Sequence, residues 1–526
     1  MTLRTCLLTL TCAAALAVPA ALAPAAPARA ATDMKAVLEA EIVTLDPHAT
    51  GAYITRTFGF MVFDMLFAMD SKGEIKPQMV DSWTTSDDGL TWTFTLRDGL
   101  KFHDGAPVSG ADVAASITRW MPQSMMGKLL KEAGGVVEGG DGNTFTITVT
   151  TPFPLMTTVL GHTSSPSPFI MPARLAATPI GQPLPEIVGS GPFVYDPAKH
   201  QPGASMTLTR FADYVPRDEP ADFLAGGKVV NVDELTIDVI PDALTATSAL
   251  NAGDIDYMQY LPFDMLPMEE ADPNVEVMNF HGGNMFMGYY PINFRNPPFD
   301  NPKIRQVLYS FVDQTSVLAA MGLSEQYTVP DCQSWFMCGM PYETTAGSLF
   351  PEKVSIEAGK EALAASGYKG EEIVILQATD LEAARVSSAV LYEWMRQVGF
   401  NVKLEAMDWA SLLSTRKDEK AWHIYGIHSL GVDLGNPMTN FMTARNCMPM
   451  PGWYCDDAIG KALDGFRTAD GADAQKAAAD EVSRAVYAAN TGLMWGQFAQ
   501  PAGLKAGVTD MIPSAIPVFW NVKLPE

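Results

Sequence analysis

The first thirty residues have the three parts of an export signal, and this feature decides in which compartment the rest of the chain must fold. Arg4 supplies a positive charge, residues 7–18 form an apolar run, and residues 28–30 are Ala-Arg-Ala, a small-x-small cleavage sequence. The apolar run is only about a dozen residues long, whereas a bilayer crossing needs about 20. The sequence therefore predicts that residues 1–30 are a signal peptide, cleaved near Ala30, and that the mature chain folds in an oxidising compartment outside the cytoplasm.

The composition indicates a large folded protein with an acidic surface. Removing 30 of the 526 residues leaves 496, more than one hydrophobic core usually serves, so two or three domains are expected. Hydrophobic residues make up 47% of the chain, enough to fill such cores. The signal carries two arginines and no acid, so 33 basic residues face 60 acidic ones and the mature net charge is −27. This charge argues against nucleic acid and anionic membranes as partners.

Four cysteines follow the signal and predict disulfides. They are Cys332, Cys338, Cys447 and Cys455, and four cysteines allow three pairings. Their close spacing favours Cys332–Cys338 and Cys447–Cys455. The alternative is a four-thiolate zinc site, but zinc sites usually place two to four residues between ligands and these gaps are five and seven. We therefore expect two small disulfide loops and no metal.

The first half of the chain predicts two strands of one sheet with a helix between them. Residues 91–97 alternate apolar and polar side chains, as a half-buried strand does, and residues 143–149 alternate in the same way. Ser109 is placed to cap a helix over 110–120, with Asp112 in the position of the acid of a capping box.

The second half predicts parallel sheet covered by helices. Residues 372–376 and 401–406 predict strands on either side of an amphipathic helix over 381–397. A strand, a helix and a strand in this order form a βαβ unit, which indicates the α/β class. Residues 304–312 and 472–489 predict two further helices.

Three segments match one protein family in their order and spacing. Residues 91–105 are Thr-Trp-Thr-Phe-Thr-Leu-Arg-Asp-Gly-Leu-Lys-Phe-His-Asp-Gly, and residues 188–193 are Val-Gly-Ser-Gly-Pro-Phe. Residues 293–307 contain Asn-Phe, then Pro-Phe-Asp, then Arg-Gln-Val. Together they resemble the extracellular solute-binding proteins of peptide and nickel ABC importers (family 5), which include oligopeptide- and dipeptide-binding proteins. The resemblance extends across nearly the whole mature chain.

This resemblance implies an α/β, two-lobed periplasmic-binding-protein fold of type II. It belongs to the large cluster with an extra subdomain, in which mixed sheets are flanked by helices and a hinge joins the lobes. Lobe I is expected to comprise residues 31–64, 188–285 and 492–526. A family-specific subdomain of lobe I is expected over 65–187, and lobe II over 286–491.

No catalytic motif stands out in the sequence. It contains no His-Glu-x-x-His, no Gly-x-Ser-x-Gly and no phosphate-binding loop that ends in Gly-Lys-Ser/Thr. Gly189-Ser190-Gly191 has its glycines too close for a nucleophile elbow, and Pro192 cannot serve as an interior residue of the helix that such an elbow needs. We expect a backbone turn there and no enzyme activity.

Asp433 is the most specific candidate for ligand contact. It lies in the segment Gly-Val-Asp-Leu-Gly-Asn-Pro over 431–437. Peptide binders of the resembled family have an Asp-x-x-acid/Asn-Pro segment whose first aspartate receives the α-ammonium group of the ligand. A buried cation must be paired, and a carboxylate supplies a charge-assisted hydrogen bond. The resemblance thus implies ligand contact for Asp433, with Asn436 in the same segment. The alternative is an exposed aspartate in a turn.

Aromatic side chains are the next candidates, because rings offer apolar area at little cost in side-chain entropy. The resemblance places Tyr53 where the first lobe faces the cleft and Tyr289 beside the expected hinge. Trp422 precedes the segment with the candidate aspartate, and Trp495 lies near the return crossing between the lobes. For each of the four, the alternative is packing in the core.

Together these features predict a periplasmic receptor without a cofactor, the substrate-binding component of an ABC importer. It is expected to capture a peptide or peptide-like solute between two closing lobes. It would deliver this solute as a monomer to a membrane permease, with no nucleic acid partner. Alternatives within the class are a nickel chelate, an opine-like conjugate or an oligosaccharide as the solute. The alternative from another class is a secreted two-lobed hydrolase.

Overall fold

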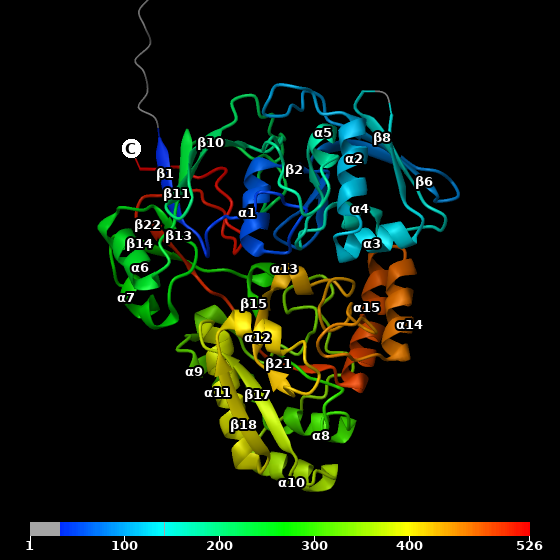
Figure 1. The fold of residues 1–526 in the computed structure, drawn as a ribbon, viewed down its shortest axis with the longest axis vertical. Helices are drawn as coiled ribbons and strands as arrows, with labels where there is room; N and C mark the ends of the chain where they lie inside the picture. The colour runs from blue at the N-terminus through cyan, green and yellow to red at the C-terminus, as the bar shows by residue number, and fades with distance from the viewer. Residues whose placement is uncertain (1–31, 141, 526) are drawn as a thin grey trace, which may run out of the picture.

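The computed structural model describes residues 32–140 and 142–525, so the predicted signal peptide lies outside the described part. Within it the chain forms two lobes, one above the other in Figure 1, with the short helix α13 (Gly431–Leu434) between them. None of the helices in these two ranges combines the length and the apolar character that a bilayer crossing needs.

A seven-stranded mixed sheet forms the centre of lobe I and gathers strands from distant parts of the chain. In spatial order its strands are β10 (Phe193–Gln201), β11 (Ser205–Arg210), β12 (Glu234–Asp238), β1 (Asp33–Val37), β13 (Tyr257–Met258), β22 (Ala502–Lys505) and β14 (Val275–Met278). β1 lies parallel to both of its neighbours. The chain leaves this strand at Val37, and the residues that follow reach the space between the lobes.

The subdomain of lobe I is an antiparallel sheet covered by a helix. Its strands are, in order, β5 (Val80–Thr85), β6 (Thr91–Leu96), β8 (Thr144–Thr148) and β7 (Val136–Gly139), and α2 (Gly110–Trp120) packs on β7 and β8. The prediction that β6 and β8 belong to one sheet is confirmed, and the two strands are direct antiparallel neighbours in it. The predicted capping box is confirmed too, since the Ser109 side chain accepts the Asp112 N–H and the Asp112 side chain accepts the Ser109 N–H.

Helix α1 (Tyr53–Val62) connects the strand end of β1 to the subdomain. Every residue of α1 except Tyr53 is buried, including Arg56, whose charge therefore needs a partner inside the protein. Two small sheets follow it, β2 (Asp64–Met65) with β9 (Phe169–Ile170) and β3 (Phe67–Met69) with β4 (Ile75–Pro77). The remaining helices of lobe I are α3 (Met125–Glu132), α4 (Met156–Leu160), α5 (Ala173–Ala176), α6 (Ala243–Ala252) and α7 (Leu266–Glu269).

Two sheets form lobe II. The antiparallel one contains, in order, β16 (Thr328–Val329), β21 (Gly492–Phe498), β15 (Phe286–Pro291) and β20 (Ile427–Leu430). The parallel one contains β18 (Asn401–Met407), β17 (Glu372–Ala378) and β19 (Ile424–Tyr425). Helix α11 (Glu382–Val398) connects β17 to the parallel β18, so the predicted βαβ unit is confirmed.

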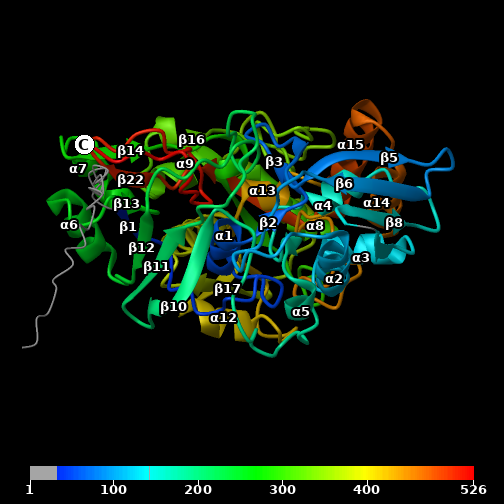
Figure 2. The ribbon, with the colours of Figure 1, turned by 90° about the horizontal axis from the view of Figure 1, so that it is seen from above.

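Further helices surround these two sheets. They are α8 (Pro302–Val307), α9 (Gln314–Ala320), α10 (Ile356–Ser366), α12 (Trp409–Thr415), α14 (Asp457–Thr468) and α15 (Ala472–Ala489). α15 has the predicted bounds, whereas the predicted helix over 304–312 appears as α8 followed by a 3₁₀ turn over Leu308–Ser310. α14 and α15 pack side by side, and Figures 1 and 2 agree that they lie beneath the subdomain of lobe I.

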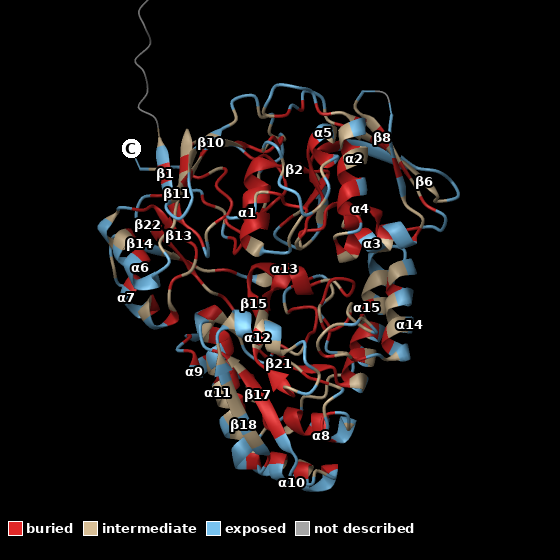
Figure 3. Cartoon of the chain, in the orientation of Figure 1, coloured by how far each residue is buried: buried red, intermediate tan, exposed pale blue. Residues whose placement is uncertain are grey.

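Within the described residues the chain crosses between the lobes twice, over 279–285 and over 499–501. β21 belongs to the lobe II sheet, so the return crossing comes after Phe498, later than the boundary at 492 that the sequence predicts. The Gly431 N–H donates to the Met285 carbonyl oxygen at 2.8 Å, which joins the start of α13 to the first crossing. Figure 3 shows that α1 and α13, which face each other where the lobes meet, are buried.

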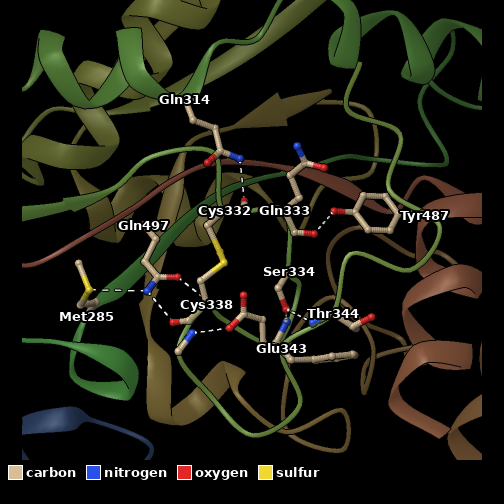
Figure 4. Close-up of a disulfide and its surroundings, with 12 residues drawn as sticks. Met285, Gln314, Cys332, Gln333, Ser334, Cys338, Glu343, Thr344, Tyr487 and Gln497 are labelled. Carbon is tan, nitrogen blue, oxygen red and sulfur yellow. Dashed lines mark hydrogen bonds between the residues drawn. A yellow bond between two sulfur atoms is a disulfide. The ribbon is translucent and has the colours of Figure 1, made fainter. Parts of the chain in front are cut away.

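Both predicted disulfides, Cys332–Cys338 and Cys447–Cys455, are confirmed. The first closes a loop that hydrogen bonds hold to the rest of lobe II (Figure 4). Gln497, on β21, accepts the Cys338 N–H at 2.9 Å and donates to the Cys338 carbonyl oxygen at 3.0 Å. Gln314 donates to the Cys332 carbonyl oxygen at 2.9 Å.

Replacing both Cys332 and Cys338 by serine is expected to lower the free energy of unfolding by about 2 kcal/mol, because a covalent closure of such a short loop restricts the unfolded chain. Ligand affinity is expected to stay unchanged, since neither cysteine lines the cavities described below. Urea unfolding of the oxidised variant and wild type measures the first effect and calorimetry the second. Equal stability of the two proteins would contradict the structural role of this bond.

Candidate ligand-binding site

Two adjoining cavities lie between the lobes. Their volumes are about 740 Å³ and about 460 Å³, within the range of small-molecule binding sites. Glu39, Tyr53, Leu381 and His428 line both of them. Because Glu39 and Tyr53 come from lobe I and Leu381 and His428 from lobe II, the junction of the cavities is built by both lobes.

The larger cavity has an acidic lining. Residues 37–41 and 258–260 line it from lobe I, and residues 380–383 line it from lobe II. Its acidic side chains are Glu39, Glu41, Asp238, Asp380 and Glu382, and none of its described lining residues is lysine or arginine. A concave surface with charges of one sign raises the local concentration of groups of the opposite sign. This cavity therefore favours the cationic part of a solute.

The smaller cavity carries two arginines without acidic partners. Arg416 donates from Nη1 to the Tyr425 hydroxyl at 2.9 Å, and the Arg445 guanidinium lies 4.3 Å from the centre of the Phe441 ring. Neither arginine forms an ion pair within the described residues, and Nε of Arg445 is buried without a hydrogen-bond partner. A guanidinium offers a fork of donors that matches a carboxylate, so this cavity favours the anionic part of a solute.

Behind the junction, α1 of lobe I contacts α13 of lobe II through a buried ion pair. Arg56 Nη1 lies 3.0 Å from Asp433 Oδ1, and the two side chains are 2% and 1% exposed. The Ser164 hydroxyl donates to the same carboxylate oxygen. The Arg56 guanidinium also lies 4.3 Å from the centre of the Tyr53 ring. Of these four residues only Tyr53 lines the cavities.

The ionisable groups at the junction are shifted toward their neutral forms. Burial raises the pKa of Glu39 to about 7, although the positive charge of Arg56 opposes this shift. Burial lowers the pKa of His428 to about 4, and the imidazole ring packs edge-on against both Phe286 and Phe498, at 5.1 and 5.6 Å between ring centres. At neutral pH His428 is therefore an uncharged ring, whereas Glu39 exchanges a proton near this pH.

The sequence profile of the bacterial extracellular solute-binding proteins, family 5 (middle region), matches residues 74–450. The chain belongs to this family. A probable peptide ABC transporter periplasmic-binding protein of Sinorhizobium fredii is 34% identical over 488 residues, which cover 91% of each chain. The glutathione-binding protein of Escherichia coli K12 is 26% identical over 387 residues, 72% of this chain and 70% of the relative.

Solved structures show the shared two-lobed fold of family 5. The oligopeptide-binding protein of Bacillus subtilis, solved with a nonapeptide, superposes with a TM-score of 0.73 at 17% identity and covers 94% of this chain and 99% of its own. The family and the α/β fold inferred from the sequence are thus confirmed.

In this family-5 protein, two of the six residues predicted to contact the ligand line the cavities. Tyr53 lines both, and Tyr289 lines the smaller one. The Tyr289 hydroxyl lies 3.0 Å from Ser429 Oγ, which fixes the ring beside the cavity.

The two predicted tryptophans lie behind the cavity walls. Trp422 is fully buried and donates from Nε1 to the carbonyl oxygen of Arg416 at 2.9 Å. Trp495 is also fully buried and donates to the carbonyl oxygen of Tyr289 at 3.2 Å. Each indole therefore holds the backbone of a residue that lines the smaller cavity.

Asn436 and Asp433 also lie outside the cavity linings. Asn436 Oδ1 accepts the Met438 N–H at 2.8 Å and so stabilises the turn after α13. Asp433 is buried, and the predicted alternative of an exposed turn residue is wrong for it. Its predicted partner, the α-ammonium group of a ligand, has a competitor within the protein in Arg56.

Seven charged residues that line the cavities, five acids and two arginines, were not among the predicted contacts. Arg416 follows α12, Arg445 lies just before the second disulfide, and Glu39 follows β1. Lys and Arg together are 35 residues in a chain with 60 acids, but this excess of acids does not indicate which arginines lack an acidic partner. Arg97 and Arg305 also form no ion pair within the described residues and donate to backbone carbonyl oxygens instead. Only the fold shows that Arg416 and Arg445 line a cavity.

The raised pKa of Glu39 predicts a dependence of stability on pH. Its ordinary pKa of 4.5 rises to about 7 in the folded protein, so between these values the folded state holds a proton that the unfolded state releases. The free energy of unfolding of wild type, minus that of Glu39→Gln, is therefore expected to decrease as the pH rises from 5 to 8. The effect is moderate, because the Glu39 side chain opens onto the cavities and water screens it. Urea unfolding of both proteins at pH 5 and pH 8 measures this difference, and a constant difference would contradict the shift.

Proposed function

We propose that this protein is the substrate-binding component of an ABC importer and that it captures a peptide or peptide-like solute between its two lobes. The family of extracellular solute-binding proteins to which it belongs supports this role, as do relatives named for peptide and for glutathione. One observation carries the choice of solute. The interlobe space is acidic in one cavity, and the other holds two arginines that form no ion pair with any described residue, which suits a dipolar solute.

In this proposal the carboxylate of the solute binds Arg416 and Arg445, and its cationic part lies in the acidic cavity. The rings of Tyr53 and Tyr289 pack against the apolar parts of the solute between these ends. Trp422 and Trp495 act indirectly, because they hold the backbone of cavity residues.

Binding and closure are coupled in this proposal. The solute touches Glu39 and Tyr53 on one lobe and the two arginines on the other, so all of its contacts exist together only in the closed arrangement. The closed receptor then delivers the solute to the membrane permease. The mature protein acts as a monomer in the periplasm, after cleavage of the signal peptide near Ala30, and binds without turnover.

Equilibrium dialysis against a defined mixture of dipeptides and tripeptides tests the proposal. The purified mature protein is expected to retain a subset of the mixture at one molecule per chain, and mass spectrometry of the bound fraction identifies it. The retained peptides are expected to be chemically unchanged. Retention of no peptide would overturn the choice of solute, and cleaved peptides would identify a hydrolase instead.

A further inference from the structure

The buried carboxylate of Asp433 already has a cationic partner inside the protein. Arg56 lies on α1 of lobe I, 377 positions before Asp433, which lies on α13 of lobe II. Nη1 of Arg56 is 3.0 Å from Oδ1 of Asp433 and 3.5 Å from the Thr163 carbonyl oxygen. The Ser164 hydroxyl donates to the same Oδ1.

The opposite charges of Arg56 and Asp433 neutralise each other, so this pair attracts an ammonium group less than a lone carboxylate would. An unpaired buried carboxylate attracts an ammonium group strongly, because both charges are otherwise uncompensated. With Arg56 in place, an arriving ammonium group would add a second positive charge to an electrically neutral pair. It would also have to be desolvated beside the Arg56 guanidinium, which repels it.

The position of the ion pair also argues against an ammonium group of the solute binding at Asp433. Asp433 is 1% exposed and Arg56 is 2% exposed, and neither lines a cavity. Tyr53 is the member of this cluster that reaches both cavities, and the Arg56 guanidinium lies against its ring. Oδ2 of Asp433 has no hydrogen-bond partner within the described residues, but a solute in the cavities meets Tyr53 and not this oxygen.

We infer that Arg56 determines the ligand specificity of this receptor by occupying the carboxylate of Asp433. Recognition then does not depend on a free α-amine at Asp433, and the receptor takes carboxylate-bearing, peptide-like solutes whose α-amine is either free or substituted. This inference rests on the proposed function and deepens it, because it states which group of the solute Asp433 does not bind. Arg56 acts through Asp433 and the Tyr53 ring, so it is a positioning residue.

The test compares each peptide with its Nα-acetylated form, using one defined mixture of dipeptides and tripeptides and the same mixture after acetylation. The measured quantity is the ratio of free to acetylated peptide retained, read by mass spectrometry. Asp433→Asn is expected to leave this ratio within about threefold of wild type. Arg56→Met leaves Asp433 without its cation and is expected to raise the ratio by at least about tenfold, and the double variant is expected to return to the wild-type ratio.

The double variant Arg56→Met/Asp433→Asn is the control for folding, because it leaves neither charge buried alone. Comparing it with wild type decides the question even if a single variant does not fold. The inference would be overturned if the ratio of free to acetylated peptide fell about tenfold or more, relative to wild type, in Asp433→Asn or in the double variant. Such a fall would show that Asp433 binds the ammonium group of the peptide in wild type.

The inference and the proposed function fail in different ways. If neither wild type nor any variant retains a peptide, the proposed choice of solute is wrong. Urea unfolding then still tests whether Arg56 and Asp433 form a coupled ion pair. Coupled charges predict that the double variant unfolds at a higher urea concentration than either single variant. Additive losses in the two single variants would show that Arg56 does not neutralise Asp433, and the inference would be wrong.

Discussion

Replacing Arg445 by methionine is expected to weaken the binding of carboxylate-bearing dipeptides and tripeptides by about 2–5 kcal/mol, since the solute carboxylate would lose its charged partner when the lobes close around it. Every 1.4 kcal/mol corresponds to about tenfold in affinity, so the largest loss would abolish measurable binding. Arg445 is well suited to this role, because it lines the smaller cavity, has no acidic partner within the described residues and keeps Nε unpaired. Methionine retains much of the side-chain length and removes only the charged fork.

Two further variants distinguish the loss of the contact with the carboxylate from a loss of affinity that any arginine substitution would cause. Arg445→Lys keeps the positive charge but lacks the fork, so an intermediate loss is expected. Arg396→Met makes the same substitution at an exposed position of α11, where Arg396 pairs with Glu393, and no change in affinity is expected. Calorimetry with the peptides that wild type retains measures all three variants.

Peptides with an amidated C-terminus supply the decisive comparison. If Arg445 binds the carboxylate, the amidated peptides bind wild type weakly and lose little more in Arg445→Met. An equal loss for free acids and amides would show that Arg445 shapes the cavity without contacting the carboxylate. A fully retained affinity for the free acids would exclude Arg445 from the site.

The parts of the fold that the sequence predicts well depend on residues close together in the chain. The capping box joins Ser109 to Asp112, and each disulfide joins cysteines six or eight positions apart. Alternation along β6 and β8 is likewise a property of a few consecutive residues. The position of β21 was less predictable, because Gly492–Phe498 is a buried strand and its sequence does not indicate which lobe it joins.

The binding site was only partly predictable, for the same physical reason. The resemblance places Tyr53 at the cleft and Tyr289 beside the hinge, and both line the cavities between the lobes; their contact with a ligand stays a prediction. The resemblance also assigned Asp433 a ligand partner, but the partner that the fold brings to it is an arginine 377 positions away. No local pattern can indicate such a contact. Arg56 moreover lies in a helix whose neighbouring side chains are all apolar or small, where its charge had no evident function.

Replacing Asp46 by asparagine is expected to lower the free energy of unfolding by about 3–5 kcal/mol, because it leaves a buried guanidinium without its counter-charge. Arg119 Nη1 donates to Asp46 Oδ1 at 2.9 Å and Nη2 donates to Oδ2 at 2.5 Å. The two side chains are 5% and 7% exposed. Asparagine offers one acceptor in place of two, and its amide N–H groups would face the donors of Arg119.

Asp46→Asn is also expected to destabilise helix α1, which carries Tyr53 at the ligand site. Asp46 lies in the segment between β1 and α1, and Arg119 lies on α2, so the pair fixes the segment that leads to Tyr53 against the subdomain. The His48 N–H also donates to Asp46 Oδ1, at 3.1 Å. Hydrogen exchange of α1 is therefore expected to accelerate in Asp46→Asn before the whole protein unfolds.

Asp213→Asn is the matched control, because it removes an exposed carboxylate that pairs with Lys101 at 2.8 Å and is expected to cost at most about 1 kcal/mol. The double variant Asp46→Asn/Arg119→Met tests the reason for the loss. Removing the lone buried charge is expected to recover part of the stability that Asp46→Asn loses. If Asp46→Asn unfolds at the same urea concentration as Asp213→Asn, then this pair contributes no more than a surface ion pair, and the start of α1 is held by packing alone.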